Sequence, residues 1–119
     1  MMLNDFVSRV TGGEQVDFKE TMAIIAEYYD YHPTEFSNGL QQPQFNAAGQ
    51  NEGSCKIFAF AKLQGFDQQQ TLALFGDYYH RDVLMNPNGS DHQNIRSFMR
   101  DGWDGIVFKG EALKLKHAD

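Results

Sequence analysis

The chain has 119 residues, the size of one typical domain, and its 41% hydrophobic and 22% charged residues indicate a globular protein rather than a disordered one. A formal net charge of −6 argues against a protein that holds nucleic-acid phosphates or anionic lipids over a broad surface. The single cysteine excludes an internal disulfide and a cysteine-rich zinc site. We therefore expect one domain over residues 1–119 that contacts neither nucleic acid nor membrane.

The first half of the chain begins with two predicted helices. Apolar residues at helical spacing predict the first helix, and they are Leu3, Phe6, Val7 and Val10. We expect this helix to be part of the folded domain and to end at Thr11-Gly12-Gly13. Asp17 with Glu20 resembles a capping box that opens a second helix. Pro33 is expected to end that helix, because proline disfavours helix at the residue before it.

The middle of the chain is expected to be a loop followed by a buried helix. Residues 36–51 contain Pro, Gly and several Gln and show no helical period, so they are predicted to form a long surface loop. Thr34–Phe36 is predicted to be a short edge strand. The Ala- and Phe-rich stretch after Ser54 predicts a helix that Ser54 caps and Gly65 closes.

The second half continues with two helices and a strand. Asp67 with Gln70 repeats the capping-box pattern, and Gly76 is expected to kink or split the helix that follows. Ser90 with Gln93 is expected to cap the last helix. From Ile106 on, the sequence predicts one strand or a short hairpin. The predicted fold is a single α+β domain, mostly helical with about five helices, and a small antiparallel sheet that includes the C-terminal strand.

Cys55 is the first candidate for chemistry. It falls in the first turn of a predicted helix and next to Lys56, and both features lower the pKa of a thiol. A thiolate nucleophile would need His80 or His92 as its base, with Asp77 or Asp91 to orient the imidazole. The alternative is that Cys55 is a buried packing residue, since free cysteine is among the most buried residue types.

The same region also predicts a ligand site. The long loop directly before the Cys55 helix is expected to form it, with Asn51 and Ser54 as binding residues and with Tyr78 and Tyr79 supplying contact area. Asp77 and His80 share a helical spacing that two metal ligands could use, but no specific metal motif is present. We therefore expect no metal and no cofactor.

Charge and hydropathy give the expected compartment. Residues 1–53 hold eight Asp and Glu against two basic residues, so this half could be a solvated acidic face or could dock a basic partner. Neither a secretory signal nor an apolar run long enough to span a membrane is apparent. The lone thiol fits a reducing cytoplasm.

Several motifs resemble the HopJ type III effector family. They are Ala48–Gly65, Phe75-Gly76-Asp77-Tyr78-Tyr79, Asp82-Val83-Leu84, Asp91–Arg96, Gly102-Trp103 and Phe108–Leu113. The resemblance covers nearly the whole chain. It implies delivery into a host cell by type III secretion, and it implies no defined activity.

We therefore expect a small soluble effector-like protein that acts by binding a protein or small-molecule partner. The alternative is a thiol-dependent enzyme of acyl-transfer or amide-hydrolysis type with Cys55 as nucleophile.

Overall fold

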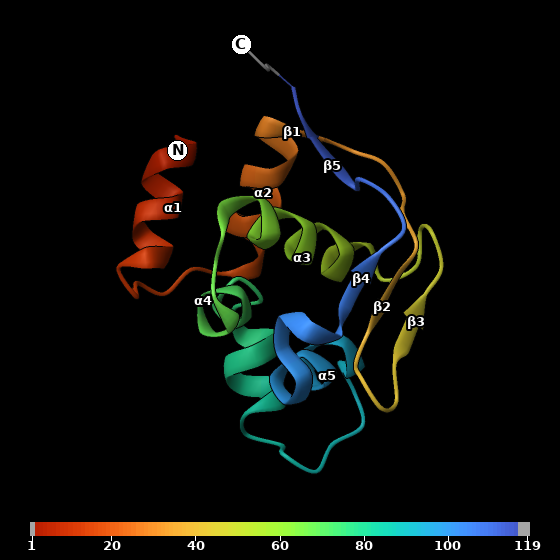
Figure 1. Ribbon diagram of the computed structural model, residues 1–119. Helices are drawn as coiled ribbons and strands as arrows, with labels where there is room; N and C mark the ends of the chain where they lie inside the picture. Colours follow the sequence, from red (N-terminus) through yellow and green to blue (C-terminus); the bar gives the residue numbers. More distant parts are fainter. Residues whose placement is uncertain (1, 117–119) are drawn as a thin grey trace.

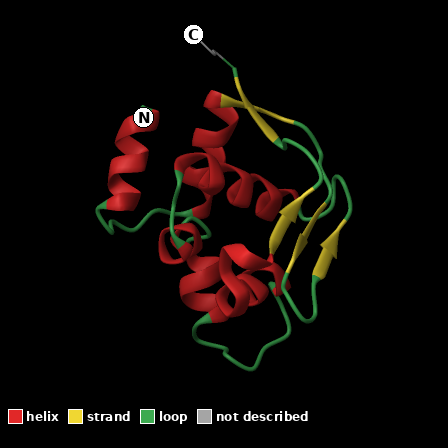
Figure 2. Cartoon of the chain, in the orientation of Figure 1, coloured by secondary structure: helices red, strands yellow, loops and turns green. Residues whose placement is uncertain are grey.

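A computed structural model describes residues 2–116. Its helices and strands occupy separate sides of the molecule, as Figure 2 shows. The helical segments are α1 (Leu3–Thr11), α2 (Phe18–Tyr28), α3 (Glu52–Gln64), α4 (Gln68–Ala73), the π-helix η1 (Tyr78–Val83), α5 (Gln93–Asp101) and the 3-10 helix η2 (Gly102–Gly105). The strands are β1 (Tyr29–Tyr31), β2 (Phe36–Asn38), β3 (Gln44–Asn46), β4 (Ile106–Phe108) and β5 (Leu113–Leu115). The predicted mostly helical α+β fold is confirmed.

The strands form two antiparallel sheets. β1 pairs with β5, and β2 lies between β3 and β4. The C-terminal region was expected to be one strand or a hairpin, but β4 and β5 belong to different sheets. The backbone explains this result, because the chain leaves β4 beside β2 and reaches β1 only after residues 109–112.

Two helices begin as the sequence predicts. Asp17 accepts from the Glu20 backbone N–H at 2.7 Å, and the Glu20 carboxylate accepts in return from the Asp17 N–H. Asp67 and Gln70 make the same reciprocal pair at the start of α4. Each box satisfies backbone donors that the first turn of a helix leaves unpaired.

Three predictions about the first half are wrong. α2 ends at Tyr28, ahead of Pro33, because the chain continues directly into β1 and pairs with β5. Residues 36–51 are not a loop throughout, since they contain the β2–β3 hairpin. β2 is a central strand rather than an edge strand. Its inward-facing residues include a buried asparagine, Asn38, which an apolar alternation pattern does not reveal.

The centre of the core is α3, which runs through the middle of the molecule (Figure 1). Phe58 on this helix packs against aromatic rings from β2, from the turn after α4, from α5 and from η2, which are Phe36, Phe75, Phe98 and Trp103. Phe60 contacts Phe6 of α1 and Tyr29 of β1. The first helix therefore contributes to the core, as expected.

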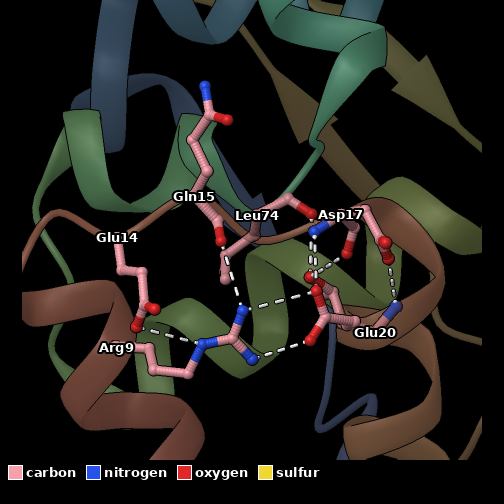
Figure 3. A network of polar contacts seen from close by, with 7 residues as sticks. Arg9, Glu14, Gln15, Asp17, Glu20 and Leu74 are labelled. Carbon is pink, nitrogen blue, oxygen red and sulfur yellow. Dashed lines mark hydrogen bonds and ion pairs between the residues drawn. The ribbon is translucent and has the colours of Figure 1, made fainter.

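A polar network joins α1 to the start of α2, and Figure 3 shows it from close by. Arg9 Nη1 lies 2.7 Å from Glu20 Oε2, and Arg9 Nε lies 3.2 Å from Glu14 Oε2. Glu20 also closes the capping box of α2, so one carboxylate serves both the helix start and the helix–helix contact. The hydroxyl of Thr21, one residue further, donates to the buried Leu74 carbonyl at 2.9 Å.

Gly76 separates α4 from η1, as the sequence predicts. Its φ is +59°, and a Cβ at this position would lie 2.8 Å from the backbone nitrogen of Phe18. Both the left-handed backbone and the close approach require glycine. The turn at Gly76 places Tyr78 of η1 beside Phe18 of α2.

Candidate functional site

A cleft of about 440 Å³ lies where α3 and α5 begin, and we call it the α3–α5 cleft. Residues from α2, β3, α3, η1 and α5 surround it, together with Phe75 and the residues just before α3 and α5. They are Phe18, Gln44, Asn51, Gly53, Ser54, Phe75, Tyr78, His92, Gln93, Asn94 and Ile95. The lining thus comes from segments distributed over most of the sequence.

Two residues at the edge of the cleft have an unusual backbone. Asn51 and His92 stand immediately before α3 and α5, with φ angles of 53° and 51°. Among residues 2–116, they are the non-glycine residues with positive φ. The left-handed region is uncommon for such residues, although asparagine and histidine enter it more readily than most. The surrounding contacts must therefore hold both residues in place.

A buried asparagine network holds the first of them. Asn51 Nδ2 donates to Asn46 Oδ1 at 2.7 Å, and Asn94 Nδ2 donates to the same oxygen at 2.8 Å. Asn38 Nδ2 donates to the Asn94 carbonyl oxygen at 2.8 Å. The network joins β2 and β3 to the starts of α3 and α5, so the sheet fixes the spacing of the two helices beneath the cleft.

Aromatic rings form a second wall. Tyr78 packs edge-on against Phe18 with ring centroids 4.9 Å apart, and its other neighbour is His92 at 5.1 Å. His92 Nε2 lies 3.0 Å from Asp82 Oδ2, which orients the imidazole. The cleft therefore has an aromatic side made from α2 and η1 and an amide side made from β3, α3 and α5.

The chemistry of the lining is that of uncharged hydrogen bonding. None of the described residues that line the cleft is Asp, Glu, Lys or Arg. Gln44, Asn51 and Gln93 each carry both a donor and an acceptor in the side-chain amide. Such a lining suits a ligand that has hydrogen-bonding groups on one face and an apolar face on the other.

The structure brings together four residues that the sequence singled out. Asn51, Ser54, Tyr78 and His92 all line the α3–α5 cleft. Tyr79 does not line it: this side chain is buried, and its hydroxyl accepts from Gln69 Nε2 at 3.4 Å.

Three more residues of the proposed thiol site, Asp77, His80 and Asp91, also lie outside the cleft lining. Asp91 is exposed, and its Oδ1 atom accepts from Arg96 Nη2 at 2.7 Å. Asp77 is exposed just before η1. His80 packs against the Tyr79 ring, with centroids 5.0 Å apart.

Cys55 is in an environment that opposes thiolate formation. The side chain is 1% exposed, and Sγ donates to the Thr34 carbonyl oxygen at 3.6 Å. Burial raises the pKa of the Cys55 thiol, and this effect outweighs the lowering by Lys56. Lys56 Nζ lies instead over the Tyr31 ring, 4.8 Å from its centroid. Among residues 2–116, no histidine is hydrogen-bonded to the thiol.

The start of this helix also differs from the prediction. Asn51 rather than Ser54 is the residue before the first helical turn, and α5 likewise begins after His92 rather than after Ser90. Gln93 Nε2 still donates to the Ser90 carbonyl oxygen at 2.6 Å, which ties the preceding loop to the helix. The shift at α3 places Ser54 in the first turn, facing the cleft.

Sequence reasoning missed several cleft residues. Gln44 and Asn94 of the lining, and the buried Asn46 that bonds to Asn94, have no periodic pattern that marks them, and the Asn46–Asn94 contact joins residues 48 positions apart. The available signal was the three asparagines in the polar segment, Asn38, Asn46 and Asn51, together with Asn94 later in the chain. Buried asparagines form networks because an unpaired amide is costly in the core.

Two further features bear on function. In the described part of the chain, no cluster of three His, Cys, Asp or Glu side chains is placed to hold a metal ion. No helix among residues 2–116 combines the length and the hydropathy that crossing a membrane requires.

Comparison with known proteins gives two matches. The sequence model of the HopJ type III effector protein family matches residues 3–113. A crystal structure of a protein of unknown function, VPA0580, is 46% identical, with 98% of this chain and 95% of that chain covered and a TM-score of 0.93. No curated protein matches the chain.

Proposed function

The chain belongs to the HopJ type III effector family, and from this premise we propose that it acts by binding a small, uncharged, hydrogen-bonding ligand in the α3–α5 cleft. The ligand class follows from the lining, because a charged ligand would meet no Asp, Glu, Lys or Arg there to pair with. Carbohydrates and blocked peptide amides have the required combination of polar edges and apolar faces.

One observation supports the proposal most directly. Asn51 and His92 are both held in a left-handed backbone at the edge of the same cleft, the first by Asn46 and the second beside Asp82. Strained residues persist where the surrounding structure fixes them, and they are concentrated at binding and catalytic sites. A rigid lining also lowers the entropy cost of ligand binding.

The thiol-dependent alternative has less support. A nucleophilic cysteine needs an accessible thiolate and a base within hydrogen-bonding reach. Cys55 is buried and hydrogen-bonded to the Thr34 carbonyl, and its pKa is raised by burial. Binding therefore accounts for the site better than acyl transfer.

We also propose that the protein works in a cytoplasm, either that of the producing bacterium or that of a host cell after type III delivery, which the family name implies. A reporter enzyme that is active only inside host cells, fused to the C-terminus of the full chain, tests delivery. Signal in host cells that disappears in a strain lacking the secretion apparatus is the expected result. Equal signal from both strains would contradict delivery by this route.

Binding in the cleft is tested by NMR titration of the ¹⁵N-labelled protein. The probes are neutral mono- and disaccharides and N-acetyl amino acid amides, each added at millimolar concentration. We expect at least one probe to shift the backbone amide signals of Gly53, Ser54 and Gln93. If none of the probes moves these signals, a neutral-ligand site is contradicted.

A matched pair of variants shows whether the shifts come from the cleft. Gln93→Trp places a large ring in the cleft, whereas Gln41→Trp places the same ring on the exposed turn of the β2–β3 hairpin. Both positions are exposed, so both variants should fold. The probe shifts should disappear in the first variant and persist in the second, and shifts that survive Gln93→Trp would locate binding elsewhere.

A further inference from the structure

A second groove, of about 810 Å³, lies between α3 and β5, and we call it the α3–β5 groove. It shares no lining residue with the α3–α5 cleft. One wall is the outer surface of α3, with Ala59, Lys62 and Leu63, and the other includes the consecutive residues 110–115. In Figure 1, β5 lies beside α3 on the upper right of the molecule.

The strand in this groove has an open edge. His32 N donates to the Ala112 oxygen at 2.8 Å, and Lys116 N donates to the Tyr28 oxygen at 3.0 Å, so these residues of the C-terminal segment face β1. Backbone groups alternate in direction along a strand, and Leu113 and Leu115 therefore direct their N–H and C=O groups to the opposite edge. Among the described residues, the sheet contains only β1 and β5.

This open edge borders the groove. β5 contributes all three of its residues to the lining, whereas β1 contributes Tyr29. Leu113 is buried and Leu115 is 46% exposed, so the groove combines accessible strand backbone at Leu115 on one side with a helix on the other. An extended peptide can bind such a site by adding a strand to the sheet while its side chains contact the helix.

Apolar side chains are available for such a peptide. Leu63 on α3 is 58% exposed and Leu115 on β5 is 46% exposed, and both line the groove. Leu3 and Phe108 extend the apolar lining at the level of the α1 N-terminus and the end of β4. Exposed apolar surface in a concave site marks a binding surface more often than isolated exposed leucines do.

The charges in the groove favour an acidic peptide. Lys62 on the helix wall and Lys114 on the strand wall are both exposed, and the lining holds one carboxylate, Glu111. Asp30 of β1 lies directly opposite Lys114, so Lys62 is the lysine of the pair that has no carboxylate directly opposite it in the sheet. The whole chain carries a net charge of −6, so this lysine pair is a local exception to the acidic surface. Complementary charge across a groove selects the partner and raises the association rate.

A second copy of the chain fits this edge less well. Symmetric antiparallel pairing of two β5 strands centred on the middle residue would place Lys114 directly opposite Lys114 of the other copy. Like charges directly opposite each other destabilise a strand pair, and edge lysines are a common device against self-association.

We propose that the α3–β5 groove binds an extended partner segment that alternates acidic and apolar residues and adds an antiparallel or parallel strand to the open edge of β5. The partner's backbone bonds to Leu115, and its apolar side chains contact Leu63 and Leu115. Its acidic groups lie on the opposite face of the added strand, where Lys114 points. This interaction is independent of the ligand proposed for the α3–α5 cleft.

The test uses three short blocked peptides and the ¹⁵N-labelled protein. The first peptide alternates glutamate and valine, the second alternates lysine and valine, and the third is the first with alternate backbone amides methylated on the edge that would face β5. We expect the first to shift the amide signals of Leu113 and Leu115 and the other two to bind at least about tenfold more weakly. No shift at these amides with the first peptide, or equal binding of the lysine peptide, would overturn the proposal.

Surface variants distinguish peptide binding in the groove from non-specific binding elsewhere on the surface. Leu63→Glu should abolish binding of the glutamate–valine peptide, and Lys114→Glu should weaken it. Leu40→Glu is the matched control, because Leu40 is also 58% exposed but lies outside the groove. Binding that survives Leu63→Glu, or that Leu40→Glu removes equally, contradicts the assignment. Sedimentation that shows a dimer broken by Leu63→Glu would instead identify a second copy as the occupant and overturn the proposal.

Discussion

Asn51 donates its side-chain N–H to the Oδ1 atom of Asn46 at 2.7 Å, and this bond joins the first left-handed helix start to the buried face of β3. Asn46 is fully buried, and its oxygen accepts a second bond, from Asn94. One side chain thus fixes the starts of both helices that form the α3–α5 cleft. A ligand in that cleft would bind to groups whose positions depend on the hairpin rather than on the helices themselves.

Asn46→Ala should destabilise the protein. The substitution removes the acceptor that Asn51 and Asn94 share. It leaves the Nδ2 group of the buried Asn94 unpaired, which costs about 1–3 kcal/mol, whereas Asn51 is exposed and can bond to water instead. We expect a melting temperature several degrees below that of the wild type by differential scanning calorimetry. Asn88→Ala, at an exposed turn position, is the control and should leave the melting temperature nearly unchanged. Equal melting of the two variants would show that the network contributes little.

Two substitutions of His92 test whether its left-handed backbone conformation is strained. A β-branched residue cannot readily adopt the left-handed conformation that His92 has, whereas glycine can. Both His92→Val and His92→Gly lose the Asp82 contact, so their difference isolates the backbone. In urea denaturation, His92→Val should be less stable than His92→Gly by about 1–2 kcal/mol. A valine variant as stable as the glycine variant would show that the helix start relaxes to another conformation.

Gly76→Ala should lower the free energy of unfolding more than Gly13→Ala does. Both glycines have positive φ, so both alanine variants carry backbone strain of about 1 kcal/mol. A Cβ at Gly76 would also meet the Phe18 backbone at 2.8 Å, while a Cβ at Gly13 meets nothing within 4 Å. Denaturant unfolding should therefore show a clearly larger loss of free energy for Gly76→Ala. Similar losses at the two sites would mean that the turn can open without cost.

Cys55 should be unreactive in the folded protein. Alkylation by iodoacetamide is expected to be slow until the chain unfolds, because the thiol is buried and its pKa is raised by burial. A urea-denatured sample is the control for full reactivity. Rapid alkylation of the folded protein at neutral pH would restore the thiol-dependent alternative.

The raised pKa of the Cys55 thiol makes the free energy of unfolding depend on pH. A raised folded-state pKa means that the unfolded chain releases the thiol proton first, so this contribution to stability is complete below the usual thiol pKa of about 8.5 and is lost as pH rises through the folded-state value. Burial raises the pKa of Tyr31 in the same direction, and its contribution is lost at higher pH. Cys55→Ala should lose less stability than the wild type between neutral and alkaline pH, and an equal loss would contradict this account.

Arg9 should stabilise the fold at neutral pH more than at acid pH. The hydrogen bond from Arg9 lowers the pKa of Glu20, so the contribution of this pair is present above the usual glutamate pKa and is lost as pH falls through the lowered value. Arg9→Met removes the pair and keeps the aliphatic stem. We expect the variant to be less stable than the wild type at neutral pH and to approach it in acid, as circular dichroism melts can show. A difference that is constant with pH would assign the effect to packing alone.

Much of the helical framework could be predicted from local sequence. The Asp17 and Asp67 capping boxes, the left-handed Gly65 after α3 and the break at Gly76 all follow from contacts within a few residues, and the structure confirms them. The apolar stripe of the first helix likewise predicted that Phe6 and Val10 would pack inward. Such features are readable because capping and helical periodicity depend on near neighbours.

The β2–β3 hairpin could not be predicted in this way. Its inward positions include Asn38 and Asn46. Because asparagine is polar, a pattern based on alternating hydropathy predicts a loop there rather than a strand. These side chains are acceptable in the core only because Asn94, about 50 residues later, pairs with them. Strand identity at this place is therefore a property of the tertiary contacts.

By itself, the sequence determined most of the helical framework, the mostly helical α+β class and the polar and aromatic residue types that would form a site. Only the tertiary structure decided which of these residues face one another. It turned Asn51, Ser54, Tyr78 and His92 toward one cleft and placed the Cys55 thiol against the Thr34 carbonyl. The physical reason is that capping and periodicity act within a helical turn, whereas burial and amide pairing depend on segments that meet only after the chain has folded.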